Sequence, residues 1–229
     1  MNRYAFPILI AGNAVLFFIL TLVFGLLIHK KAGEPYRFRQ YFPYELFHDS
    51  RGLYLIPRVT QAISASASFL YPIYLYSSVK ESFLTQPTYI IMLTIMEGLL
   101  NFSLFALTFI PLKHERQHVS LFFLYSALLA IRNAATGTIF LSIANASTEA
   151  KILDDVFAIV AFLFALLSLL PLLNPKLKNY AQMVPTTQKD GTVKLERPKY
   201  FVLAFSEWLL YFHQILSFLW IVVGFSVMK

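Results

Sequence analysis

Residues 119–143 read VSLFFLYSALLAIRNAATGTIFLSI, a largely apolar run with a single arginine, Arg132, near its middle. An α-helix rises about 1.5 Å per residue, so this run is long enough to cross the ~30 Å hydrocarbon core of a bilayer. A charged side chain at that depth is costly in lipid and normally faces the interior of a bundle, where it finds a partner. The stretch therefore predicts a membrane helix that packs against other membrane helices through Arg132.

The composition of the whole chain agrees with a membrane location. Of the 229 residues, 58% are hydrophobic and only 14% are charged, which leaves too little polar surface for a water-soluble protein of this size. The chain has no cysteine, which excludes a disulfide framework, a thiolate nucleophile and a cysteine-ligated metal. The net charge of +7 lies mostly between the apolar runs, so we expect membrane lipids as partners, and no nucleic acid.

Six apolar runs are long enough to span a bilayer. They predict an all-α, polytopic membrane helical bundle with six transmembrane helices, formed by residues 1–229 as a single domain. Both termini then lie on one side of the membrane, and the first, third and fifth loops lie on the other. The predicted spans cover residues 7–28, 60–79, 88–111, 119–143, 152–173 and 200–228.

Cationic residues are concentrated in the odd-numbered loops. By the positive-inside rule, this distribution would place those loops in the cytoplasm. The side with both termini carries only Arg3, Lys80, Lys151 and Lys229. The odd-numbered loops carry fourteen of the 19 lysines and arginines: Lys30, Lys31, Arg37, Arg39, Arg51, Arg58, Lys113, Arg116, Lys176, Lys178, Lys189, Lys194, Arg197 and Lys199.

Three ionisable residues lie at the same depth in different spans. Counted from the end that carries the third loop, Glu97, Arg132 and His213 are each roughly 20 Å inside. An unpaired charge at that depth is expensive, so we predict that Glu97 and Arg132 form a structural ion pair. Such a pair either clamps two helices together or lines a polar cavity, and the sequence leaves both roles open.

The predicted helix at residues 200–228 carries a polar stripe. Glu207 lies about 10 Å inside the same end, and Gln214 follows it two helical turns later, so the two share one face. His213 points to another side of this helix, where a hydrogen bond to a neighbouring helix is its simplest role.

Residues 114–118, HERQH, match the H-E-x-x-H pattern of zinc peptidases. On a helix, His114 and His118 would grip one zinc ion while Glu115 activates the attacking water. A catalytic site needs a third protein ligand that no second motif supplies, and the charge of Arg116 opposes a bound dication. We therefore expect a polar turn between two helices here, with no metal and no cofactor. A membrane-embedded zinc hydrolase stays an alternative.

Three short motifs resemble the Frag/DRAM/Sfk family of six-span membrane proteins, which includes the GPI-anchor lipid remodelling factor of the Golgi. Residues 41–52, YFPYELFHDSRG, are similar to the family's Pro-Tyr segment, which is followed by polar, acidic residues and a glycine. Residues 113–123, KHERQHVSLFF, are similar to its short turn with a histidine before the fourth helix. Residues 205–214, FSEWLLYFHQ, are similar to its Glu-aromatic pair in the last span.

The resemblance implies a multi-pass membrane protein of the Golgi or the endoplasmic reticulum that acts in GPI-anchor lipid remodelling or membrane trafficking. It implies a polar cleft that binds an anionic lipid, with GPI-anchored proteins as further partners, and it leaves open whether the protein is an enzyme. In this reading, Arg37, Arg39, Arg51 and Arg58 hold the lipid phosphate, and His118, Glu207 and His213 supply proton transfer or polar contacts.

The sequence leaves two possible membrane orientations and a second possible function. The family's topology places the odd-numbered loops in the lumen, and we favour it over the charge rule because long loops cross membranes largely regardless of their charge. The rival function is a small transporter or channel, in which Glu97, Arg132 and His213 form a relay near the membrane midplane.

Overall fold

The computed structural model is almost entirely helical, which confirms the all-α prediction. It describes residues 5–31, 33, 36–46, 55–78, 87–110, 114–146, 151–174, 184–188, 190–196 and 198–227. The helices in chain order are α1 (Ala5–Lys31), α2 (Pro43–Leu46), α3 (Leu55–Ser78), α4 (Pro87–Phe109), α5 (Glu115–Ala146), α6 (Lys151–Leu169) and α7 (Val202–Val227). A 3₁₀ turn, η2 (Leu170–Leu173), continues α6, and two strands, β1 (Val184–Thr187) and β2 (Val193–Glu196), precede α7.

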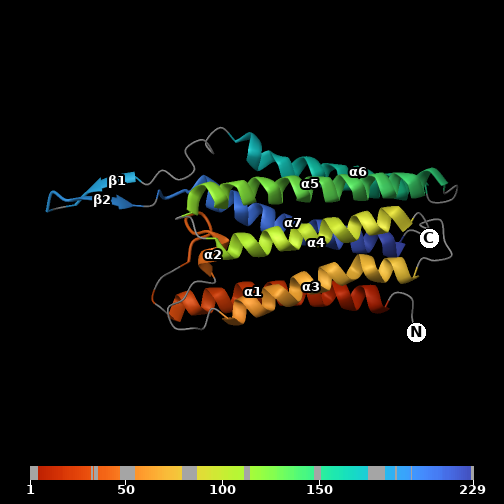
Figure 1. Ribbon diagram of the computed structural model, residues 1–229, viewed down its shortest axis with the longest axis horizontal. Helices are drawn as coiled ribbons and strands as arrows, with labels where there is room; N and C mark the ends of the chain where they lie inside the picture. The colour runs from red at the N-terminus through yellow and green to blue at the C-terminus, as the bar shows by residue number, and fades with distance from the viewer. Residues whose placement is uncertain are drawn as a thin grey trace.

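The long helices lie side by side along one axis (Figure 1). α1 packs mainly against α3 and α5 mainly against α6, while α4 and α7 connect these two pairs. The start of α1 and the end of α7 lie at one end, whereas α2, the start of α5 and the two strands lie at the other, which we call the loop end. The helices follow the predicted spans, and the largest difference is that α3 begins at Leu55 and not at residue 60.

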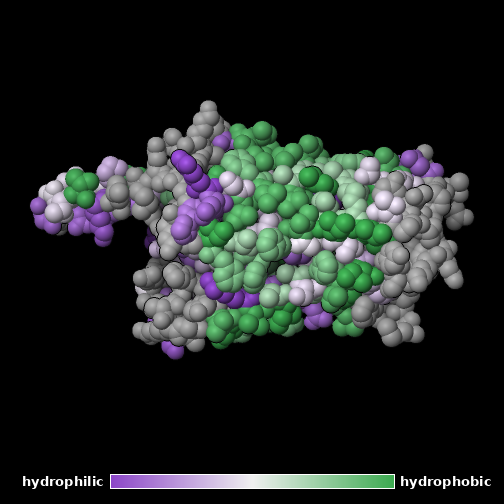
Figure 2. All heavy atoms as spheres, viewed as in Figure 1, coloured by the Kyte–Doolittle hydropathy of each residue, from purple (hydrophilic) through white to green (hydrophobic). Residues whose placement is uncertain are grey.

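The surface and the helix lengths are those of a multi-pass membrane protein. Among the described residues, five helices are long and apolar enough to cross a membrane, namely α1, α4, α5, α6 and α7. α3 falls below this level because serine, threonine and glutamine interrupt its apolar residues. Apolar side chains cover most of the bundle face that Figure 2 shows, and Phe102 and Leu166 are 71% and 62% exposed. Such an extensive exposed apolar surface is unsuited to water and suited to lipid.

Residues 36–46 fold over the loop end of the bundle. The short helix α2 forms there because its N-terminal end is well capped: Pro43 occupies the first helical position, and the Glu45 carboxylate accepts a hydrogen bond from the Phe42 N–H at 2.8 Å. Phe42 and Leu46 are fully buried and pack into the main core beside α1, α4 and α7. The Tyr36 hydroxyl donates to the Phe42 carbonyl at 2.7 Å and holds the preceding chain against this turn. We call residues 36–46 the loop 1 cap.

The two strands form an antiparallel hairpin that projects from the loop end (Figure 1). Gly191 adopts a φ of 79° in its turn, and the Asp190 carboxylate accepts hydrogen bonds from the backbone and the hydroxyl of Thr192. These two bonds hold the pKa of Asp190 below its ordinary value. The sequence analysis expected only a long loop here, because the strands are four residues each and lack the alternating apolar pattern of longer strands.

Gly25 is required where α1 meets the loop 1 cap. A Cβ atom at Gly25 would collide with the side chain of Leu46, whereas a Cβ at Gly12, also in α1, would meet nothing within 4 Å. We expect Gly25→Val to lower the free energy of unfolding by about 1–3 kcal/mol, because Leu46 must move out of a packed site. Gly12→Val is the matched control and should change it by much less. Thermal unfolding in detergent checks this, and equal effects of the two substitutions would contradict the docking of α2.

Candidate functional site

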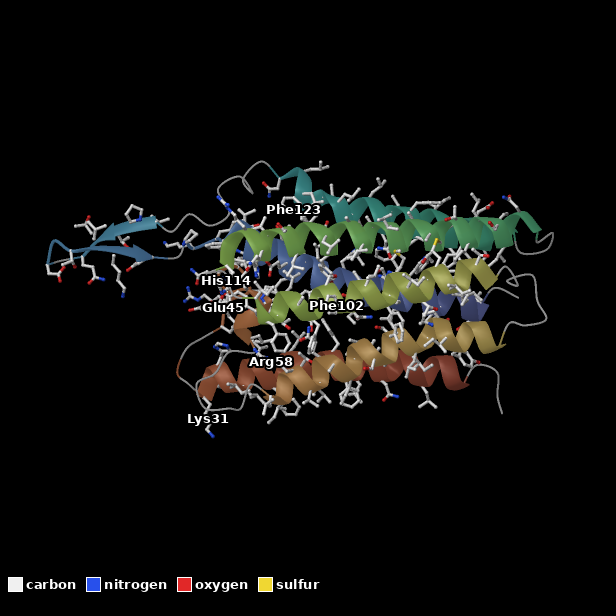
Figure 3. The ribbon with its side chains drawn as sticks, viewed as in Figure 1. Lys31, Glu45, Arg58, Phe102, His114 and Phe123 are labelled. Atoms are coloured by element: carbon white, nitrogen blue, oxygen red, sulfur yellow. The ribbon has the colours of Figure 1, made fainter. Side chains whose placement is uncertain are left out.

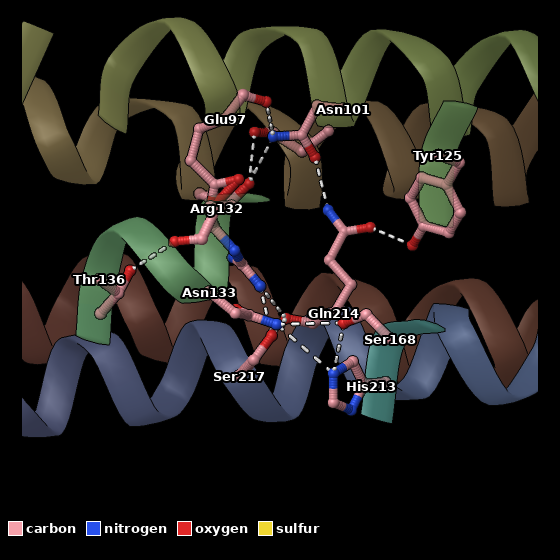
Figure 4. Close-up of polar contacts among 12 residues, drawn as sticks. Glu97, Asn101, Tyr125, Arg132, Asn133, Thr136, Ser168, His213, Gln214 and Ser217 are labelled. Carbon is pink, nitrogen blue, oxygen red and sulfur yellow. Dashed lines mark hydrogen bonds and ion pairs between the residues drawn. The ribbon is translucent and has the colours of Figure 1, made fainter. Parts of the chain in front are cut away.

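The interior of the bundle contains the predicted ion pair (Figure 4). The Nη1 of Arg132 in α5 donates to Oε1 of Glu97 in α4 at 2.8 Å, and both side chains are buried. The Nη2 of Arg132 donates to the Ser217 hydroxyl and to the Gln214 carbonyl, both in α7. One guanidinium therefore joins three helices, which confirms the prediction that Glu97 and Arg132 are partners.

An amide-based network extends from the ion pair toward the loop end. The side-chain amide of Gln214 donates to Asn101 Oδ1 at 3.0 Å and accepts from the Tyr125 hydroxyl at 2.5 Å. Asn101 in turn donates to the Ser68 hydroxyl of α3 at 3.0 Å and to the Glu97 carbonyl at 2.9 Å. Side chains from α3, α4, α5 and α7 thus meet in one connected set of hydrogen bonds. The sequence analysis did not find Ser68 or Tyr125, since serine and tyrosine are common at packing faces and interfaces of membrane helices.

His213 faces α6 and lies apart from the Glu207–Gln214 stripe, as its position on the helix predicted. Its Nε2 lies 3.0 Å from the Ser168 hydroxyl, 2.9 Å from the Phe164 carbonyl and 3.4 Å from Asn133 Nδ2. These contacts bind α7 to α6 and α5 (Figure 4). The structure therefore gives His213 the role of a hydrogen-bonded link between helices.

A second buried pair, His118 and Glu207, lies nearer the loop end. His118 Nε2 is 2.6 Å from Glu207 Oε1, and His118 Nδ1 is 2.5 Å from the Ile110 carbonyl. Both side chains are buried, and both residues lie within the first two turns of their helices, α5 and α7. The sequence analysis named both residues but did not pair them.

The loop 1 cap covers this acid–base pair. The rings of Phe42 and Tyr44 lie 5.4 and 5.5 Å from the His118 ring. Trp208, which follows Glu207 in α7, donates its indole N–H to the Tyr41 carbonyl at 2.9 Å and contacts the Tyr36 hydroxyl at 3.2 Å. The His118–Glu207 pair is therefore enclosed by aromatic side chains of the first loop.

The two histidines of the H-E-x-x-H pattern do not share a site. α5 begins at Glu115, so His114 precedes the helix, and its side chain is exposed whereas His118 is fully buried. Both ring nitrogens of His118 already have hydrogen-bond partners, which leaves neither free for a metal. Within the described ranges, no three histidine, aspartate or glutamate side chains come together as metal ligands.

Cationic side chains surround the loop 1 cap. Arg37 and Arg39 are exposed, while the Arg58 guanidinium lies over the Phe109 ring at 4.2 Å from its centroid. Arg58, Lys31, His114 and Glu45 appear together at the loop end in Figure 3. Arg51, the fourth arginine expected to bind lipid, lies outside the described residues. The lysines and arginines described at this end are Lys30, Lys31, Arg37, Arg39, Arg58, Arg116, Lys194 and Lys199.

The polar interior is closely packed. Two of its cavities have polar residues in their lining. The centre of a water molecule can occupy about 20 Å³ in one and about 10 Å³ in the other. These volumes suit single water molecules and are too small for a lipid headgroup. Neither of these two cavities therefore provides the polar cleft that the resemblance implies, and the exposed Arg37 and Arg39 line neither of them.

Comparisons of this chain with protein-family models, with curated proteins and with solved structures give no match. The resemblance to the Frag/DRAM/Sfk family therefore rests on the three short motifs and on the predicted six-span topology alone.

His118 and His114 make a matched pair for testing the site. We expect His118→Ala to lower the free energy of unfolding by roughly 3–5 kcal/mol, because it leaves the Glu207 carboxyl buried without its partner. His114→Ala should have little effect, since that side chain is exposed. Thermal unfolding in detergent measures both, and the zinc content of the purified proteins should be the same in the wild type and in both variants. About one zinc per chain, lost with either histidine, would contradict the hydrogen-bonded role of His118.

Proposed function

We propose that the protein is a six-span membrane factor that binds anionic lipid headgroups at its loop end and acts in GPI-anchor lipid remodelling. The observation that carries the proposal is that the loop 1 cap, which carries the exposed Arg37 and Arg39, packs through Phe42 and Tyr44 on His118 of the buried His118–Glu207 pair. The assignment to GPI-anchor lipids, and to the Golgi or the endoplasmic reticulum, rests on the family resemblance.

The proposal counts α3 as the sixth span, because Thr60, Gln61, Ser64 and Ser68 face the bundle interior and the exposed Ser66 hydroxyl donates to the Ala62 carbonyl of the same helix. The Thr60 hydroxyl is 2.8 Å from that of Thr21 in α1, and the Ser64 hydroxyl donates to the Ala14 carbonyl at 2.7 Å. Satisfied polar groups on an inner face are compatible with a membrane span. The outer face carries large exposed apolar side chains: Leu55, Ile56, Val59, Ile63, Phe69, Leu70 and Ile73.

The loop end offers the chemistry that a phosphate headgroup requires. Arginine binds phosphate through paired N–H donors, and cations near a membrane surface each contribute about 1 kcal/mol of attraction to anionic lipid. Arg37 and Arg39 lie on the described part of loop 1, and the Phe201 N–H donates to the Arg39 carbonyl at 2.7 Å, which fixes this loop against the start of α7. A headgroup bound here would leave its acyl chains beside the apolar outer faces of the helices.

His118 and Glu207 supply the reactive groups in this proposal. A histidine and a carboxyl in direct contact can exchange a proton and act as general acid and base. In the closed conformation Phe42 and Tyr44 cover His118, so a headgroup reaches the pair only when the loop 1 cap moves aside. The proposal assigns Glu97 and Arg132 to helix association and His213 to the contact with α6.

Charge reversal at the loop end tests the binding step. The purified protein is exchanged into a mixture of phosphatidylinositol and phosphatidylcholine. Native mass spectrometry then identifies the lipid that the protein retains. We expect the wild type to retain phosphatidylinositol preferentially, and Arg39→Glu or Arg37→Glu to reduce that preference severalfold, because each reversal turns an attraction of about 1 kcal/mol into a repulsion.

Lys194→Glu is the matched control, since it reverses one charge on the hairpin, away from the loop 1 cap. An equal loss in Lys194→Glu would mean non-specific attraction and would contradict a site at the cap. In cells that depend on the introduced gene, Arg39→Glu and His118→Ala should also alter the lipid composition of GPI anchors. Unchanged anchors in cells that lack the gene would overturn the assignment to GPI-anchor remodelling.

A further inference from the structure

The inner face of α3 carries a buried amide whose hydrogen-bonding capacity is unused. Gln61 is 3% exposed, and neither its Oε1 nor its Nε2 has a hydrogen-bond partner among the described residues. Buried polar groups of proteins are almost always satisfied by protein or by ordered water. Gln61 therefore indicates a ligand that can both donate and accept hydrogen bonds.

A polar cavity lies directly beside this amide. Its lining includes Gln61, Ser64 and Ser68 from α3, Asn101 from α4 and Gln214 from α7, with Phe18 of α1 closing one side. The centre of a water molecule can occupy about 20 Å³ of this cavity, which is room for one or two waters. The cavity lies on the seam where the α1–α3 pair meets α4 and α7.

A second cavity lies one helical turn deeper along the same face of α3. Its lining is mostly apolar (Tyr71, Pro72, Leu93, Phe218 and Ile221, with Glu97 and Arg132), and no polar atom of the described residues faces its open space of about 10 Å³, so it is not a second water site. The Oε2 of Glu97 and the Nε of Arg132 lack hydrogen-bond partners within the described parts of the chain. Pro72 has no N–H, so α3 cannot supply the usual helical donor to the carbonyl of Ser68.

We propose that the seam between the α1–α3 pair and the rest of the bundle binds ordered water in the cavity beside Gln61. Water fits this cavity because it donates and accepts in a volume of this size. A metal cation would serve only the Gln61 oxygen and leave its NH₂ group unpaired, and an anion would serve only the NH₂ group.

Bound water would complete the hydrogen bonds that protein groups leave open. It bridges Gln61 of α3 to the polar groups of α4 and α7 that line the same cavity. The α1–α3 pair is then joined to the bundle partly through water, whereas α5 and α6 are joined by direct packing. This inference does not depend on the proposed lipid function.

Radiolytic footprinting of the full-length protein in detergent tests the proposal. X-rays split bound water into hydroxyl radicals that oxidise adjacent side chains, and mass spectrometry locates the products. Phe18 and Tyr211 line the cavity and are 6% and 2% exposed, and Phe140, which packs among Phe157 and Phe225 and is fully buried, is the control. We expect Phe18 and Tyr211 to be oxidised at least severalfold faster than Phe140, and H₂¹⁸O soaked into the sample to appear in the products.

A double variant and a control variant test whether the water depends on the polar side chains of the cavity. The substitutions Gln61→Leu and Ser68→Ala, made together, should reduce oxidation of Phe18 and Tyr211 to the level of Phe140. Ser66→Ala, on the exposed face of α3, is the control and should leave it unchanged. Equal oxidation of Phe18, Tyr211 and Phe140 in the wild type would overturn the proposal. That comparison needs no variant, so it decides the question even where the double variant fails to fold.

Discussion

A guanidinium that cannot reach water must find its acceptors inside the protein, and Arg132 finds them on two other helices. Arg132 donates to the Glu97 carboxylate of α4 and to the Ser217 hydroxyl and the Gln214 carbonyl of α7. All three acceptors lie outside α5, the helix that carries Arg132. Burying either charge without the other is strongly unfavourable, so the relative positions of α4, α5 and α7 are tied to this one interaction. The Asn101–Gln214–Tyr125 network and the contacts of Ser68 then follow, because their residues lie on the same faces within two helical turns of the ion pair.

The rest of the bundle is arranged so that polar groups face inward and apolar groups face outward. α3 shows this best, since Thr60 and Ser64 contact α1 and Gln61 and Ser68 line the seam, while its described isoleucine and leucine residues are exposed. At the loop end the exposed Arg37 and Arg39 belong to the loop 1 cap, while its Phe42 and Tyr44 face inward. The His118–Glu207 pair lies buried against these two rings.

The sequence predicts the features that depend on regular helix geometry. The constant rise of a helix places Glu97 and Arg132 at one depth, and the cost of an unpaired charge in lipid then predicts their contact. The spacing of Glu207 and Gln214 predicts their common face and the separate direction of His213. Local sequence patterns do not predict the contacts between segments that are far apart in the chain. The Trp208 indole bonds to the first loop, 167 residues away in sequence, and His118 bonds to Glu207, 89 residues away, and no spacing rule indicates either contact. The H-E-x-x-H match fails for the same reason, since the helix starts after His114 and Glu207 takes the nitrogen that a metal would need.

A double-mutant cycle on Glu97 and Arg132 tests most directly whether this ion pair organises the bundle. The free energy of unfolding is measured in detergent for the wild type, Glu97→Leu, Arg132→Leu and the double variant. Our account predicts that each single variant loses about 3–5 kcal/mol and that the double variant is more stable than either, with a coupling of at least about 2 kcal/mol. Losses that simply add, with the double variant the least stable of the four, would contradict it.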